Sequence, residues 1–243
     1  MAKIPGVIVA LDVEEREKAV ELVDRLEGQI DFFKVGSRLF TAEGPGMVKE
    51  ITASGARVFL DLKFHDIPAT VAGSVRAACR LGISMMTIHT CGGSDMMRAA
   101  ADEAGEYAEY SGKKKPLIVG VTVLTSMSGE DLADISRYEG SVEDLVLRRA
   151  DRAVSSGLDG VVASVSETAA IRKEFGEDII IVTPGIRPAG SSVGDQKRVA
   201  TPRTAMESGS SYLVVGRPIY QAESPAEAAA SIIGEMKGSG PTA

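Results

Sequence analysis

Two acids and a base come directly after one short apolar stretch. Residues 57–60 lead into Asp61, Lys63 and Asp66. In an extended strand, residues two apart share a face, so Asp61 and Lys63 are expected to point the same way. Carboxylates beside an ammonium favour its charged form, which predicts a lysine that stabilises negative charge or donates a proton. A lysine that attacks a carbonyl must be neutral and is disfavoured. The alternative is a structural ion-pair network, although buried ion pairs are weak sources of stability.

The secondary-structure elements that must position these residues alternate regularly along the sequence between expected strands and expected helices. Short β-branched runs are expected to be strands, and amphipathic stretches between them to be helices. The expected strands are 7–11, 32–35, 57–62, 85–89, 117–124, 160–163, 179–182 and 212–215, and helices include 14–27, 71–81, 95–110, 142–156 and 225–236. Eight such units predict a single (β/α)8 barrel. A doubly wound sheet is the alternative, but residues 9–14 lack its glycine-rich phosphate loop.

Polar residues recur where the expected strands end, which is the face on which barrel enzymes place their active sites. They are Asp12, Lys34, Asp61, Lys63, His89, Thr125, Ser126, Arg187 and Arg217, and Pro184 and Gly216 stand beside the two arginines in the same segments. Two of them have simpler interpretations: Asp12 could cap the first helix, and Lys34 could be a surface lysine. The stretch 186–196 and Gly216 suit a phosphate site, because glycine admits backbone N–H groups and arginine offers a planar pair of donors. The alternative for 186–196 is a plain flexible loop.

Composition excludes several classes of protein. The chain has 243 residues, 44% of them hydrophobic, and a net charge of −7, which is unsuited to general nucleic-acid binding. No apolar run approaches the length of a membrane helix. Cys79 and Cys91 have no metal-ligand spacing with His65 or His89, so we expect reduced core thiols in a cytoplasmic protein and no metal site. No linker divides the chain, so one domain is expected over 1–237, with a flexible tail at 238–243.

Several blocks of the sequence resemble those of bacterial orotidine 5′-monophosphate decarboxylases, and the resemblance covers nearly the whole chain. The matching blocks are residues 9–12, 34–36, 61–70, 121–126, 183–187, 194–196 and 215–218. The block 61–70 is specific, with one departure at Ala69, where many members carry asparagine. The resemblance implies a barrel enzyme that removes CO2 from orotidine 5′-monophosphate (OMP) to give UMP, the last step of de novo pyrimidine nucleotide synthesis, with no cofactor or metal.

The resemblance also implies a role for each matching residue. Lys63 is expected to protonate C6 of the pyrimidine, with Asp61 beside the departing carboxylate. Asp66, Ile67 and Thr70 are expected to reach the neighbouring site of a homodimer. Lys34 is expected to join the charged catalytic group and, with Asp12, to bind the ribose. The remaining expected contacts are Thr125 and Ser126 to the base, and Pro184, Arg187, Gln196, Gly216 and Arg217 at the phosphate end of the substrate.

Two other functions remain open from the sequence. A related barrel could act on a sugar phosphate, with Mg²⁺ stabilising an enediolate. A nucleotide-binding barrel without catalysis is the second alternative. The continuation His65-Asp66-Ile67-Pro68 favours the decarboxylase over the first, and the complete charged set argues against the second.

Overall fold

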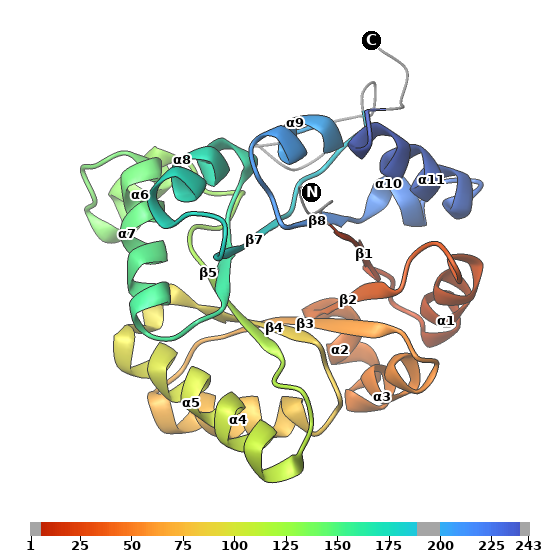
Figure 1. Ribbon diagram of the computed structural model, residues 1–243, viewed down its shortest axis with the longest axis horizontal. Coiled ribbons are helices and arrows are strands. Elements are labelled where there is room, and N and C mark those ends of the chain that lie inside the picture. Colours follow the sequence, from red (N-terminus) through yellow and green to blue (C-terminus); the bar gives the residue numbers. More distant parts are fainter. Residues whose placement is uncertain (1–5, 189–199, 239–243) are drawn as a thin grey trace.

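Eight parallel strands close into a barrel in the computed structural model, which describes residues 6–188 and 200–238 (Figure 1). Each strand pairs with its sequence neighbours, and the last pairs with the first. The strands are β1 (Gly6–Ala10), β2 (Phe32–Gly36), β3 (Arg57–Phe64), β4 (Met85–His89), β5 (Leu117–Val121), β6 (Gly160–Val162), β7 (Ile180–Thr183) and β8 (Tyr212–Val215). The predicted (β/α)8 barrel is confirmed, and the doubly wound alternative is wrong.

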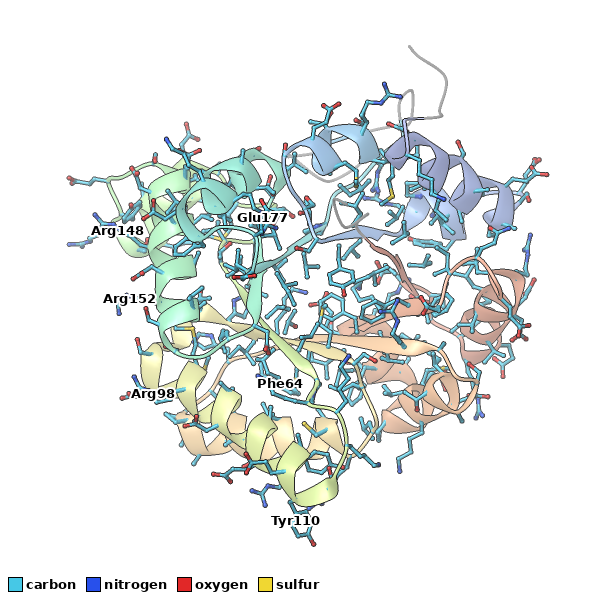
Figure 2. The ribbon with its side chains drawn as sticks, in the orientation of Figure 1. Phe64, Arg98, Tyr110, Arg148, Arg152 and Glu177 are labelled. Atoms are coloured by element: carbon cyan, nitrogen blue, oxygen red, sulfur yellow. The ribbon has the colours of Figure 1, made fainter. Side chains whose placement is uncertain are left out.

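Helices surround the strands as an outer ring (Figure 1). They are α1 (Arg16–Arg25), α2 (Ser37–Glu43), α3 (Pro45–Ala53), α4 (Pro68–Cys79), the 3₁₀ helix η1 (Thr90–Gly92), α5 (Ser94–Ser111), α6 (Gly129–Ser136), α7 (Val142–Ser155), α8 (Val165–Phe175), α9 (Pro202–Glu207), α10 (Arg217–Tyr220) and α11 (Pro225–Met236). In Figure 2 side chains fill the interior of the ring, whereas the labelled Arg98, Arg148 and Arg152 lie at its outer edge. None of the helices described is long and apolar enough to cross a membrane.

The apolar core has two layers because successive strand residues face opposite sides of the barrel wall. The larger layer lies between the strands and the helices and includes Leu60 and Ile88. The smaller layer fills the barrel interior with Ile8, Ala10, Phe32, Phe59, Met85, Val119, Val182 and Val214. This interior layer forms a solid apolar base, so polar residues from the same strands can meet only above it, at the carboxyl ends.

Two local predictions need correction. The expected strand 117–124 ends at Val121, although Thr122 still donates a backbone hydrogen bond to the Val162 carbonyl. Asp12 does not cap the first helix: α1 begins at Arg16, and its N-cap is Glu15. Asp12 is held instead by a lysine of the next strand, described below. The helix expected over 71–81 is present as α4 but begins three residues earlier, at Pro68, since proline fits the first turn of a helix. Of the predicted tail, residues 239–243 lie outside the described residues.

Candidate active site

A cavity of about 480 Å³ opens at the carboxyl ends of the strands. Its volume lies within the range of small-molecule sites. It is lined by Ala10, Asp12, Lys34, Arg38, Phe59, Asp61, Lys63, Val121, Val123, Leu124, Thr125, Val162, Val182, Pro184, Gly185, Arg187, Val214, Gly216, Arg217 and Tyr220. Apolar residues of the barrel interior form the base of this cavity, and charged residues of neighbouring strands surround the base. Most of the predicted site residues are therefore brought to one place.

Four charged side chains alternate in sign along one wall of the cavity. The Lys34 ammonium lies 2.9 Å from Asp12 Oδ1 and 3.7 Å from Asp61 Oδ2. Asp61 Oδ1 in turn accepts a hydrogen bond from the Lys63 ammonium at 2.8 Å. The order Asp12, Lys34, Asp61, Lys63 lets each inner charge meet opposite charges on both sides. We call these four residues the charged row.

The ends of β2 and β3 explain how the charged row forms. Phe59, Asp61 and Lys63 of β3 all line the cavity, while Leu62 packs against the outer core, so the predicted shared face is confirmed. At the end of β2, Gly36 leaves space for Lys34: a Cβ built there would lie 2.8 Å from the Lys34 ammonium. A larger residue at position 36 would therefore push the ammonium out of the row.

The charged row holds Asp61 ionised. Burial raises the pKa of Asp61, but Lys34 and Lys63, with a hydrogen bond from Thr87, lower it by more, so the pKa lies below its ordinary value. A carboxyl whose folded pKa is depressed stabilises the fold above its unfolded pKa, and this contribution is lost as the pH falls through the folded value. The ionised carboxylate of Asp61 is thus part of the neutral-pH structure.

Lys63 has an unusual main-chain conformation. Its φ is 52°, in the left-handed region that costs a residue with a side chain about 1–3 kcal/mol. The register of β3 against β4 also shifts between Leu60 and Phe64. Strained backbone of this kind clusters at functional sites, where the surrounding structure holds it in place.

The strained conformation of Lys63 predicts that glycine at this position is more stable than alanine, which is the reverse of the usual order. In a strand interior glycine is normally about 0.5–1 kcal/mol less stable than alanine. At position 63 we expect Lys63→Gly to exceed Lys63→Ala in free energy of unfolding by about 1 kcal/mol, because glycine accepts a positive φ without strain. Urea unfolding of both variants measures the difference. The same pair at Arg57, on the same strand with no positive φ, should show the usual order; a more stable alanine at 63 would contradict the strain.

The predicted dimer residues lie outside the cavity of their own chain. Residues 65–70 are all exposed, and the Ile67 side chain is 66% exposed. The Asp66 carboxylate turns back on its own chain, where Oδ1 accepts a hydrogen bond from the Ile67 backbone at 2.6 Å. Within one chain, therefore, Lys63 is paired with Asp61 and the second predicted carboxylate faces outward.

The candidate phosphate residues meet on the β7 and β8 side of the cavity. Pro184, Arg187, Gly216 and Arg217 all line it, and Arg187 is buried. The one-turn helix α10 follows Gly216 directly. Gln196 lies outside the described residues, as does most of the stretch 186–196.

The sequence did not indicate every polar residue of the cavity. Thr125 lines the cavity, while Ser126 is exposed and is not among the lining residues. Two lining residues with polar side chains were not predicted, Arg38 and Tyr220. Arg38 lies in the first turn of α2, directly after β2, and Tyr220 is three residues after Arg217 in α10. Proximity to strand ends is the signal that would have indicated both.

The two histidines lie beside the charged row. The His65 and His89 rings are 5.6 Å apart, and burial, together with His65 and Lys63, lowers the pKa of His89. Cys91 is exposed, with its sulfur 3.9 Å from His65 Nδ1, so the expectation of two core thiols holds only for the buried Cys79. Across residues 6–188 and 200–238, no group of three or more His, Cys, Asp or Glu side chains is placed to hold a metal ion.

A closed (β/α)8 barrel with a charged cavity at the carboxyl ends of its strands defines a barrel enzyme. A sequence model described as "Orotidine 5'-phosphate decarboxylase / HUMPS family" matches residues 5–232, and the chain belongs to this family. The family predicted from the sequence is confirmed, and so is an enzyme rather than a binding protein.

Individual relatives agree with this assignment. An orotidine 5'-phosphate decarboxylase of Moorella thermoacetica is 50% identical over 231 residues, covering 95% of this chain and 92% of the relative. One from Hydrogenovibrio crunogenus is 50% identical over 221 residues and covers 91% of each chain. The crystal structure of orotidine 5'-phosphate decarboxylase from Lactobacillus acidophilus has a TM-score of 0.85 at 38% identity, covering 96% of this chain and 99% of that chain.

Proposed function

We propose that this chain converts OMP to UMP by direct loss of CO2, as the last step of de novo pyrimidine nucleotide synthesis, without metal or cofactor. The observation that supports it is the charged row at the mouth of the barrel, with Lys63 at its end 2.8 Å from Asp61. Arg187, which follows β7, and Arg217, which follows β8, line the same cavity, which suits a substrate carrying a phosphate at one end.

The chemistry matches what the row can supply. When the C6–carboxylate bond breaks, CO2 leaves and the electron pair remains on C6 as a carbanion. Lys63, as an ammonium, stabilises this charge and then gives a proton to C6 to form the C6–H bond, after which solvent reprotonates the amine. Fixed charge in a water-poor site is an effective stabiliser of developing charge. Asp61 would lie beside the departing carboxylate and repel it, and the two lysines keep Asp61 ionised for this role.

The other contacts follow from position in the cavity. We propose that Asp12 and Lys34 bind the ribose hydroxyls and that Thr125, with Ser126, meets the base. Pro184, Arg187, Gly216 and Arg217, with Gln196, would form the phosphate end. Binding energy from a remote phosphate can be used to position and desolvate the reacting base, so these residues contribute to rate as well as to affinity.

The row also favours this reaction over Mg²⁺-dependent sugar-phosphate chemistry. Asp61 would be a natural ligand for a divalent cation, but its oxygens already lie 2.8 Å and 3.7 Å from two ammonium groups. Those positive charges repel a metal ion at the same carboxylate. Purified protein supplied with OMP should form UMP, measured by chromatography. Turnover of a keto-hexonate phosphate with Mg²⁺, and none of OMP, would contradict the proposal.

We further propose that the working form is a homodimer in which Asp66, Ile67 and Thr70 complete the partner's site. Residues 65–70 form a continuous exposed run beside the cavity, and it includes the apolar Ile67, which is 66% exposed. An exposed apolar residue beside an exposed acidic one suits a surface that a second copy covers. In a two-fold dimer the same run serves both sites.

Subunit mixing tests this arrangement. Asp66→Asn and Lys63→Ala should each be nearly inactive, because each removes one charge from every site. Mixed and re-associated in equal amounts, they should recover about a quarter of wild-type activity, since half the dimers then carry one intact site out of two. A mixture of Lys63→Ala with Lys34→Ala is the control. Both changes lie in the charged row, which each chain supplies to its own site, so no mixed dimer has an intact site and activity should not recover. Absence of recovery in the first mixture, with exchange verified, would place Asp66 in its own chain's site.

We also propose a cytoplasmic location. Both cysteines are free in the structure, which is typical of a reducing compartment. The expected partners are then OMP and UMP alone, with no nucleic acid and no membrane.

A further inference from the structure

One buried threonine lies behind the charged row. Thr87 is in the middle of β4, is 1% exposed, and belongs to the strand face that points into the barrel, between Met85 and His89. Its hydroxyl lies 3.0 Å from Asp61 Oδ1 and 2.9 Å from the backbone nitrogen of Lys63. One hydroxyl therefore contacts the carboxylate of one residue of the row and the main chain of another.

The Thr87 hydroxyl can donate its proton to only one of these two groups. A backbone N–H is a donor only, and an ionised carboxylate is an acceptor only. The Thr87 hydroxyl must therefore accept from the Lys63 N–H and donate to Asp61 Oδ1. Because threonine is β-branched, its χ1 angle is restricted in a strand, which fixes the hydroxyl in this position.

The pairing of β3 with β4 explains why the contact is needed. Leu60 is opposite Met86 and Phe64 is opposite Ile88, so residues 61–63 stand against the single residue Thr87. Extra residues in one strand leave ladder hydrogen bonds unmade. The Thr87 hydroxyl supplies an acceptor for the N–H of Lys63 at the point where its φ becomes positive.

We propose that Thr87 is a positioning residue for the reaction: its hydroxyl fixes the Lys63 main chain and the Asp61 carboxylate relative to one another. This inference rests on the proposed function, in which Lys63 protonates C6 and Asp61 lies beside the carboxylate that leaves C6. A threonine that only filled space would need no hydroxyl here.

The charges around Asp61 determine what removal of the Thr87 hydroxyl would do. Lys34 of β2 and Lys63 of β3 both form ion pairs with Asp61. Asp12 lies on the other side of Lys34, and His89 lies at the end of β4. The two lysines and the hydrogen bond from Thr87 lower the pKa of Asp61, against the effect of burial. Removing the hydroxyl should raise this pKa and loosen Lys63, whereas a serine keeps the hydroxyl and should restore both.

The experiment compares Thr87→Val, which is isosteric, with Thr87→Ser. With OMP, the valine variant should lose about 10- to 100-fold in kcat, the effect expected for a hydrogen bond to a charged group, with a smaller change in KM. The serine variant should regain most of kcat. In parallel, ¹³C NMR of the carboxyl groups should show a higher Asp61 pKa in the valine variant and a value near wild type in the serine variant. Thr87→Ala gives the same comparison if valine unfolds the barrel.

Thr168→Val is the matched control. Thr168 is also fully buried, and its hydroxyl donates to the Ser164 carbonyl at 3.0 Å, away from the charged row. This variant should lose stability without changing kcat or the pKa of Asp61. A valine variant of Thr87 with wild-type kcat and an unchanged Asp61 pKa would overturn the inference. A wild-type protein inert toward OMP would overturn the proposed function instead, and the NMR titration would still decide whether Thr87 holds Asp61.

Discussion

Lys63→Ala is expected to lower kcat for OMP by about 10⁴-fold or more, because one side chain combines proton donation with electrostatic stabilisation of the carbanion. No neighbour can take over the role. Lys34 is held between Asp12 and Asp61, at 2.9 Å and 3.7 Å, and its side chain is only 11% exposed. Initial rates followed by ultraviolet absorbance measure the loss, and a thermal melt verifies that the variant is folded.

Two further variants separate charge from proton donation. Lys63→Arg keeps the positive charge, but a guanidinium does not give up its proton in proteins, so it should retain some stabilisation and still turn over poorly. Lys49→Ala removes an exposed lysine of α3 and should behave as wild type. If Lys63→Ala kept substantial activity in a folded protein, Lys63 would not be the acid.

Arg217→Ala is expected to lower kcat/KM for OMP by about 10²-fold, as expected for a charge-assisted contact to a phosphate. Arg217 lies at the start of α10, directly after β8, and lines the cavity with Arg187. The effect should depend on the phosphate itself. Turnover of the nucleoside orotidine, which lacks the phosphate, should be nearly the same in the variant and in the wild type.

The matched control for Arg217 is Arg98→Ala. Arg98 is an exposed arginine of α5 at the outer edge of the helix ring (Figure 2) and should not affect either substrate. Equal losses with OMP and orotidine would mean that Arg217 supports the barrel rather than the phosphate. An unchanged kcat/KM for OMP would remove Arg217 from the site.

The barrel and the charged row could be predicted from the sequence because both depend on local patterns. Strand period places Asp61 and Lys63 on one face, and alternation of strands and helices brings Asp12, Lys34 and Arg217 to the same end. Each of these inferences needs only the identity of a residue and its distance from a strand end.

What could not be predicted depends on how strands pair. The positive φ of Lys63 arises where three residues of β3 face one of β4, and nothing in residues 61–63 indicates that shift. Thr87 likewise reads as an ordinary β-branched strand residue until its hydroxyl is placed against Asp61. Asp12 has the residue type of a helix cap, but an ion pair with Lys34 across two strands decides its position.

The measurement that tests the central claim most directly is the rate of OMP loss by the wild-type protein in excess EDTA. In the proposed reaction side chains alone supply the charge, those of the charged row together with Asp66 and the arginines, so the rate should equal that without chelator, and UMP should form in equal amount. A rate that falls to background with EDTA and returns with Mg²⁺ would contradict the account, because the row would then be a metal site rather than an acid.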